Sequence, residues 1–349
     1  MTEVDTERPG STHQLRRFRT RIVLAALVAV VAAAIAAGLA LATTRSSPIG
    51  SGVVVIDTNL AYQGGQAAGT GMVLTSSGMV LTNNHVIRDA TAIRVVVPTT
   101  GRSFSAKVVG YDASDDVAVL QASGASNLKT IPLGDSATLN AGQSVKALGN
   151  AGGTGSLRAA SGTVTGVDRA ITVGDDQGGD ESLTGMIETN AAVQPGDSGG
   201  PLMNAAGQVV GMDTAASVGN GVARAATSDG YAIPINKAVS IALQIVRGDA
   251  SATIHVGGTA FLGVEVEENS YGGSGAVITS VVPGGPAAAA GLTPGDLITS
   301  FGGHAVSSPA ALTTLVTTQK PGASVSATYV DQEGVTQTSN LALASGPPR

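Results

Sequence analysis

Short apolar and β-branched runs, separated by Gly, Asn, Asp and Ser, fill the chain from Val53 to about Ile235. Runs of this length between turn-forming residues are typical of strands. Residues 71–75 and 79–82 flank a Ser-Ser-Gly turn, which predicts a hairpin. The same pattern predicts further strands at 93–97, 117–121, 144–148, 162–167, 208–212 and 231–233. Their regular spacing indicates a mostly β domain, built as a sandwich or a barrel.

A helical pattern follows this region and separates it from a second compact unit. Residues 236–246 carry apolar side chains at Ala238, Ile241, Ala242 and Ile245, which predicts a helix that ends at Gly248. We expect residues 249–254 to be a linker, and residues 255–345 to form a small α+β domain. Its predicted strands are 261–266, 276–282, 297–301 and 324–329, and its predicted helix, capped by Ser308, is 309–318.

An uncharged segment from Ile22 to Thr44 precedes both units. As a helix it would be about 34 Å long, enough to cross a bilayer core of about 30 Å. Arginines are concentrated before this segment, at positions 16, 17, 19 and 21. This asymmetry predicts a cytoplasmic tail at 1–21, a transmembrane anchor at 22–44, and a linker at 45–52 that leads to an extracytoplasmic domain. The alternative is a secretory signal that is cleaved near Ala42, which would release the protein.

Composition narrows the possible functions. The chain of 349 residues has a net charge of −6, which gives no electrostatic footprint for nucleic acid. It contains no cysteine, so disulfides and zinc–cysteine sites are excluded. We expect no cofactor and no metal. The acidic residues Asp175, Asp176, Asp180 and Glu181 are interpreted as a solvated loop, because their spacing fits no known calcium loop.

Three residues carry the candidate chemistry. His85 is the only histidine inside the large β domain, and Asp116 precedes an apolar run. Ser198 lies in the segment Gln194-Pro-Gly-Asp-Ser-Gly-Gly-Pro201. Acyl transfer needs an exposed hydroxyl beside backbone N–H groups that receive the oxyanion. The N–H groups of Gly196 and Ser198, with Asp197 between them, could form that oxyanion hole.

Two other interpretations of this segment are less favoured. A plain glycine-rich turn would not need this residue order. The Gly-x-Ser-x-Gly elbow of α/β-hydrolases would need a strand before the serine, a helix after it and a later histidine. Here a turn at 204–207 and a strand follow the serine, and the later residues His255 and His304 lie outside the β domain.

On these three motifs the chain resembles the HtrA (Deg) family of trypsin-like serine proteases, in particular its PepA-type members. The motifs are Thr82-Asn-Asn-His-Val86, Asp116-Val-Ala-Val-Leu120 and Pro195-Gly-Asp-Ser-Gly-Gly-Pro201. The resemblance implies a chymotrypsin-like domain of two six-stranded barrels over residues 53–248. It implies that His85 is the general base, Ser198 the nucleophile and Asp116 the orienting acid. Asp115 is the competing acid, and Asp116 is preferred because Asp112 and Asp116 fit the family pattern D-x-x-x-D.

The same resemblance suggests where substrate binds. Residues Thr214, Ala215 and Ala216 would help line the S1 pocket, and their small side chains favour small or medium apolar P1 residues. In the C-terminal unit, Phe261, Leu262, Gly263 and Val264 resemble the carboxylate-binding loop of PDZ domains, which grips peptide C-termini. Residues 291–298 fit the PDZ pattern G-L-x-x-G-D-x-I. The alternative is a small β domain without a ligand.

The sequence therefore predicts a serine endopeptidase that cleaves misfolded or specific exported proteins outside the cytoplasmic membrane, with unfolded or extended polypeptides as substrates. The alternative is a peptide-binding, chaperone-like protein whose protease site is mostly inactive at rest. A homotrimer is an expectation from the family only. Such trimers use N-terminal aromatic contacts, and Tyr62 is the only aromatic residue between the anchor and Phe104.

Overall fold

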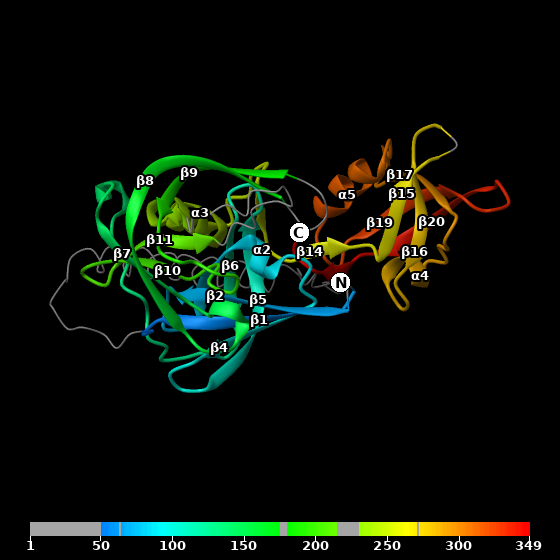
Figure 1. Cartoon of the computed structure of the whole chain (residues 1–349). Helices are drawn as coiled ribbons and strands as arrows, with labels where there is room; N and C mark the ends of the chain where they lie inside the picture. Colours follow the sequence, from blue (N-terminus) through cyan, green and yellow to red (C-terminus); the bar gives the residue numbers. More distant parts are fainter. Residues whose placement is uncertain (1–49, 63, 175–179, 215–229, 271) are drawn as a thin grey trace, which may run out of the picture.

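The computed structural model describes residues 50–62, 64–174, 180–214, 230–270 and 272–349. The predicted cytoplasmic tail and transmembrane anchor, together with most of the linker at 45–52, lie outside these residues. Among the helices that the structure describes, none combines the length and the hydropathy that a membrane span needs. The described chain is mostly β, as predicted, and Figure 1 shows its arrangement.

The first barrel contains β1 (Val53–Leu60), β2 (Gly65–Val73), β3 (Met79–Thr82), β4 (Ala92–Val97), β5 (Arg102–Asp112) and β6 (Val117–Ala122). Its order is β5-β4-β1-β2-β3-β6, and pairing between β5 and β6 closes it. The predicted hairpin is confirmed, because Met72 lies opposite Leu81 and Val73 opposite Val80. A short helix, α2 (Asn84–Ile87), follows β3.

The second barrel is closed and contains β7 (Ser144–Gly149), β8 (Arg158–Gly174), β9 (Asp180–Thr189), β10 (Pro201–Asn204), β11 (Val209–Thr214) and β12 (Gly230–Pro234). Strand β8 is much longer than the predicted strand at 162–167. The additional residues extend the strand because residues 158–163 pair with β7 and residues 164–174 pair with β9. Asp180 and Glu181, predicted to lie in a loop, begin β9. Asp175 and Asp176 lie outside the described residues.

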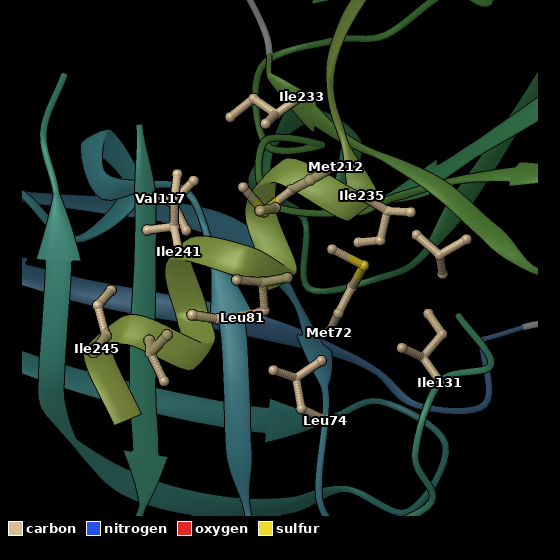
Figure 2. Packing of buried hydrophobic residues seen from close by; sticks show 14 of the residues in the cluster. Met72, Leu74, Leu81, Val117, Ile131, Met212, Ile233, Ile235, Ile241 and Ile245 are labelled. Carbon is tan, nitrogen blue, oxygen red and sulfur yellow. The ribbon is translucent and has the colours of Figure 1, made fainter. Parts of the chain in front are cut away.

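Helix α3 (Ile235–Arg247) packs where the two barrels meet. The predicted helix is confirmed, and it ends at Gly248, whose φ of 82° is left-handed. Its buried residues Ile241 and Ile245 join one apolar cluster with residues of the first barrel, such as Val117, and of the second barrel, such as Met212. Figure 2 shows this cluster around the helix. Burial of this shared cluster holds the two barrels together.

A short strand, β13 (Ile254–Val256), continues from α3 and pairs with β5 of the first barrel. Ile254 lies opposite Asp112, and His255 lies opposite Tyr111. The predicted linker at 249–254 therefore leads directly into the barrel sheet. Residue 255, predicted to begin the C-terminal unit, is part of this strand.

The C-terminal unit contains two sheets. Strands β14 (Thr259–Phe261) and β21 (Ala344–Gly346) form the small sheet. The larger sheet is β15 (Val264–Glu268), β16 (Ala276–Val281), β17 (Leu297–Phe301), β18 (His304–Ala305), β19 (Ser324–Val330) and β20 (Thr336–Ala342). The helices are α4 (Pro286–Ala289) and α5 (Pro309–Thr317). Ser308 caps α5 as predicted, because its Oγ accepts a hydrogen bond from the Ala311 N–H at 3.2 Å.

One strand of this unit was predicted wrongly. Residues 261–266 were expected to form a single strand, but the structure divides them between β14 and β15. The interruption is at Gly263, whose φ of 82° is incompatible with an extended strand. Apolar content alone does not reveal such a turn, because Leu262 beside it is buried like a strand residue.

The C-terminal unit contacts the first barrel through several residues near α2 and β1 (Figure 1). The Tyr62 ring stacks on the Phe261 ring with a centroid separation of 5.3 Å. The Asn84 side-chain amide donates to the Arg349 carbonyl at 2.9 Å, and the Asp89 N–H donates to the Pro348 carbonyl at 2.8 Å. Tyr62, the only aromatic residue between the predicted anchor and Phe104, therefore has an aromatic partner in its own chain.

Candidate active site

His85 is presented by the short helix α2, directly after β3. Asn83 stands at the N-cap position, but its side chain does not cap the helix. Its amide instead donates to the Asp116 carbonyl at 2.9 Å, which ties the start of α2 to the loop between β5 and β6. Asn83 is fully buried, so this hydrogen bond is shielded from water.

Asp116 contacts His85 through both oxygens of its carboxylate. Its Oδ1 accepts the backbone N–H of His85 at 2.9 Å, and its Oδ2 lies 2.8 Å from His85 Nδ1. Asp116 is the last residue before β6, and its φ of 52° is left-handed, which is uncommon for a residue other than glycine. Its exposed fraction is only 2%. The predicted pairing of His85 with Asp116 therefore exists, in an unusual backbone conformation.

Asp115, the competing acid, has a different partner. Its Oδ1 lies 2.6 Å from the Nζ of Lys237 on α3. The Lys237 ammonium also donates to the Thr184 carbonyl at 3.2 Å. The two adjacent carboxylates therefore point to different groups, Asp115 to the Lys237 ammonium and Asp116 to the His85 imidazole.

The second barrel also contacts Asp116. The hydroxyl of Thr214, at the end of β11, donates to Asp116 Oδ2 at 3.2 Å. Thr214 was predicted from the sequence to line a substrate pocket with Ala215 and Ala216, and this hydrogen bond was not predicted. A threonine gives no sequence signal for such a contact, which joins residues 98 positions apart. Ala215 and Ala216 lie outside the described residues.

Ser198 lies in the turn before β10, where close packing explains the glycines of its motif. Gly196 has φ of 97° and Gly199 has φ of 81°. A Cβ at Gly196 would collide with the Asn150 carbonyl, and one at Gly199 would collide with the Thr70 carbonyl and the Thr82 hydroxyl. No side chain larger than hydrogen fits these positions without a shift of backbone.

Strand β2 joins the serine turn to the histidine helix. The Thr70 N–H donates to the Ser198 carbonyl at 2.8 Å, and the Thr70 hydroxyl donates to the Gly196 carbonyl at 2.7 Å. At Gly69 a Cβ would lie 2.6 Å from Val86, the neighbour of His85, and 3.3 Å from the Ser198 carbonyl oxygen. The Val86 side chain, next to His85, and the Ser198 carbonyl therefore both lie close to Gly69 of β2.

The carboxyl of Asp197, beside the candidate nucleophile, has a partner in its own turn. Its Oδ2 accepts the Gln194 N–H at 2.9 Å, and the Asp197 N–H donates to the Gln194 carbonyl at the same distance. Its Oδ1 is buried without a hydrogen-bond partner in the described part of the chain. Burial raises the pKa of Asp197, and the hydrogen bond from Gln194 opposes that rise.

A second carboxyl, Asp213, is buried behind the same turn. Its carbonyl accepts the Gly199 N–H and its N–H donates to the Gly200 carbonyl, both at 2.8 Å. Neither carboxyl oxygen of Asp213 has a hydrogen-bond partner among the residues that the structure describes. Burial, followed by repulsion from Asp197, raises the pKa of Asp213 well above its usual range. Burial without a hydrogen-bond partner favours the neutral form of this carboxyl, because ionisation without a partner is costly.

The predicted carboxylate-binding loop lies between β14 and β15. The Leu262 and Gly263 carbonyls accept hydrogen bonds from Ala287 and Val282 at 3.0 and 2.9 Å, which fixes the loop against the following segment. Strand β15 lies at an edge of its sheet, and α5 packs near it. An extended peptide could therefore add to β15 as a further strand.

No group of three or more potential ligand side chains that could hold a metal ion occurs within the described ranges. A hydroxyl, an imidazole and a carboxylate, which are the groups that acyl transfer uses, lie there on segments that share contacts.

Two domain families match the chain. A trypsin-like peptidase domain matches residues 69–212, and a PDZ domain matches residues 260–343. The first range includes His85, Asp116 and Ser198, and the second includes the loop from Phe261 to Val264.

Two curated serine proteases are similar to most of this chain. Serine protease PepD of Mycobacterium tuberculosis is 35% identical over 304 residues, which are 83% of this chain and 63% of that protein. Periplasmic serine endoprotease DegP of Salmonella typhimurium is 34% identical, over 79% of this chain and 57% of that protein. The chain thus spans about 60% of the length of these curated relatives. Among solved structures, HtrA-type protease AlgW with tripeptide is 28% identical, with a TM-score of 0.49 over 86% of this chain and 95% of that one.

Proposed function

Because this chain belongs to the HtrA (Deg) family of trypsin-like serine proteases with a PDZ domain, we propose that it is a serine endopeptidase that cleaves unfolded or extended polypeptides. The observation that carries the proposal is the double contact of Asp116 with His85, at the backbone N–H and at Nδ1. With Nδ1 facing Asp116, the imidazole would transfer protons through Nε2.

In this proposal Ser198 attacks the scissile carbonyl while His85 Nε2 removes the proton from its hydroxyl. His85 then delivers the proton to the leaving amine. Asp116 accepts the Nδ1–H, so it selects the tautomer whose Nε2 is a base, and its charge stabilises the imidazolium. Water then hydrolyses the acyl-enzyme by the same proton transfers in reverse order.

The oxyanion would be stabilised by the N–H groups of Gly196 and Ser198, as predicted. The positive φ of Gly196 supports this role, because it turns the peptide plane before Asp197 in a way that other residues disfavour. The hydrogen bonds of Thr70 to the Gly196 and Ser198 carbonyls hold the peptide groups that follow these two N–H groups in the chain. Preorganised donors of this kind contribute about 10²–10³-fold in rate.

The test uses the full-length chain and unfolded casein. We expect the wild type to cleave casein and to be labelled covalently by a fluorophosphonate. Ser198→Ala should lose both properties while it keeps the wild-type melting temperature. A folded wild type that neither cleaves casein nor reacts with the probe would contradict the proposal.

The proposed role of the C-terminal unit is to bind peptide C-termini at Phe261–Val264, with the peptide paired to the edge of β15. Fluorescence polarisation of an apolar peptide with a free carboxylate, against its C-terminal amide, tests this role. The free acid should bind and the amide should bind at least tenfold more weakly. Equal affinities would show that the loop does not recognise a carboxylate.

We also propose that residues 22–44 anchor the chain in the cytoplasmic membrane, so that the peptidase acts on exported proteins outside it. The uncharged segment and the arginines before it support this placement. Alkaline carbonate extraction of membranes from expressing cells tests it. The anchored protein should stay in the pellet at its full mass, whereas cleavage near Ala42 would release a shorter soluble form.

A further inference from the structure

We propose that Asp112 is a positioning residue for Asp116, and that Thr253, in the segment that leads to the PDZ domain, completes its hydrogen-bond set. The observation behind this inference is the loop of four residues between β5 and β6, which begins after Asp112 and ends at Asp116. The catalytic part of the inference rests on the proposed function, whereas its geometric part does not.

Asp112 is buried and its carboxylate organises the loop from inside. Its Oδ1 accepts the Ser114 N–H at 3.1 Å, the Ser114 hydroxyl at 2.7 Å and the Asp115 N–H at 3.2 Å. Its exposed fraction is 2%. A carboxylate that accepts several local donors in this way fixes the backbone of a turn and gives charge-assisted hydrogen bonds.

The remaining oxygen of Asp112 reaches outside the loop. Its Oδ2 accepts the Thr253 hydroxyl at 2.9 Å. Thr253 directly precedes β13, and Ile254 of β13 pairs with Asp112 itself. The carboxylate that shapes the loop is therefore also attached to the strand between the barrels and the PDZ domain.

The loop between β5 and β6 needs hydrogen bonds that hold its backbone, because it contains Asp116. Asp116 adopts φ of 52°, a conformation that costs energy in an aspartate and persists only where its surroundings hold it. Both Asp116 oxygens are directed at His85, at 2.8 and 2.9 Å. A displacement of about 1 Å at such a site lowers the rate about 100-fold. Asp112 does not touch the imidazole in any described contact, so it acts through the backbone that places Asp116.

The test compares variants of the full-length chain. Asp112→Ala removes all the acceptors, Asp112→Asn keeps an acceptor for the loop, and Thr253→Val removes only the outside donor. The control is Asp331→Asn, because Asp331 holds a similar turn of the PDZ domain through the Glu333 and Val335 N–H groups.

We expect Asp112→Ala to lower kcat for casein-derived peptides at least 30-fold with KM changed less than twofold. Asp112→Asn should restore kcat to within about threefold of the wild type, and Thr253→Val should lower it about threefold. Asp331→Asn should leave kcat unchanged. A wild-type kcat in both Asp112→Ala and Thr253→Val would overturn the proposal.

An NMR measurement reports the geometry of the contact between His85 and Asp116 without requiring activity. The chain has four histidines, so the spectrum of ¹⁵N-histidine-labelled protein is simple, and His85→Ala identifies the Nδ1–H resonance of His85. Asp112→Ala should move or broaden this resonance and Asp331→Asn should not. If Asp112→Ala does not fold, the His85 resonance and kcat are measured in Thr253→Val instead. Wild-type values of both in that variant would refute the inference. If the wild type proves inactive, the resonance alone decides.

Discussion

The hydroxyl of Thr214, at the end of a strand in the second barrel, donates a hydrogen bond to Asp116 of the first barrel at 3.2 Å. The carboxylate that orients His85 is thereby held from both barrels. Thr214 is 3% exposed, so water does not replace this donor if it is removed.

Thr214→Val should therefore lower kcat/KM by at least about tenfold, because hydrogen bonds to charged groups contribute about 1.5–3 kcal/mol. Peptide hydrolysis and the rate of fluorophosphonate labelling measure the effect. Thr299→Val is the control, since its hydroxyl donates to a backbone carbonyl in the PDZ domain. An equal loss in both variants would point to a general loss of stability instead.

Asp213 makes stability depend on pH in an unusual direction. Its pKa is raised well above its usual range by burial and then by Asp197, so the folded state binds more protons than the unfolded state above about pH 4. Stability from this group is complete below the unfolded pKa and falls as pH rises toward the folded pKa, by about 1.4 kcal/mol per pH unit. Asp213→Asn removes this dependence. The melting temperature of the variant relative to that of the wild type should therefore rise as pH increases above the unfolded pKa of about 4, until the folded-state pKa of Asp213 is passed.

Asp135→Asn is the control for the pH series, because the pKa shift of Asp135 is opposite in direction to that of Asp213. The pKa of Asp135 is lowered by the Asn236 side chain and then by the Ala137 N–H. That stabilisation is present at neutral pH and is lost as pH falls through the lowered pKa. Asp135→Asn should lose melting temperature at pH 7, and the loss should shrink toward acid. Parallel curves for wild type and Asp213→Asn would show that Asp213 is not a buried neutral acid.

Gly199, the glycine after Ser198, should be sensitive to substitution. Gly199→Ala should destabilise the protein by at least about 3 kcal/mol, since it combines left-handed strain with contact against the Thr70 carbonyl and the Thr82 hydroxyl. Gly207→Ala is a matched control with φ of 74° and open space around its Cβ. It should cost only about 1–2 kcal/mol. Urea denaturation measures both, and equal costs would mean that the serine turn is not closely packed.

Residues near the end of the chain should protect an amide beside the histidine helix. Truncation after Gly346 removes the Pro348 carbonyl that accepts the Asp89 N–H. Because such a bond contributes about 0.5–1.5 kcal/mol, the Asp89 amide should exchange with solvent about three- to tenfold faster. The Thr91 amide, which donates to Asn59, is an internal reference that should not change.

Much of this fold was predictable because its signals are local. The β2–β3 hairpin, helix α3 with its Gly248 stop, and the Ser308 cap of α5 follow from patterns within a few residues, and the structure has all of them. The division between β14 and β15 was missed, because it depends on the single backbone angle of Gly263.

In the candidate site, too, local features were predicted and long-range contacts were not. The motifs around His85, Asp116 and Ser198 were visible because each is a short run of unusual residues. The contacts that hold them were not, because Thr70, Thr214 and Thr253 are common residues whose partners lie far away in the chain. The partner of Asp197 was also unknown from the sequence, and it lies only three positions away, at Gln194.

Strand β13 also determines where a fragment that contains only the peptidase domain can end. A peptidase fragment that stopped at the end of α3 would expose the outer edge of β5 and take away the donor to Asp112. Free strand edges recruit other chains, so such a fragment would be prone to self-association as well as to a misplaced Asp116. An excised peptidase unit should therefore keep the chain through Gly257, whose N–H still bonds to the Val109 carbonyl.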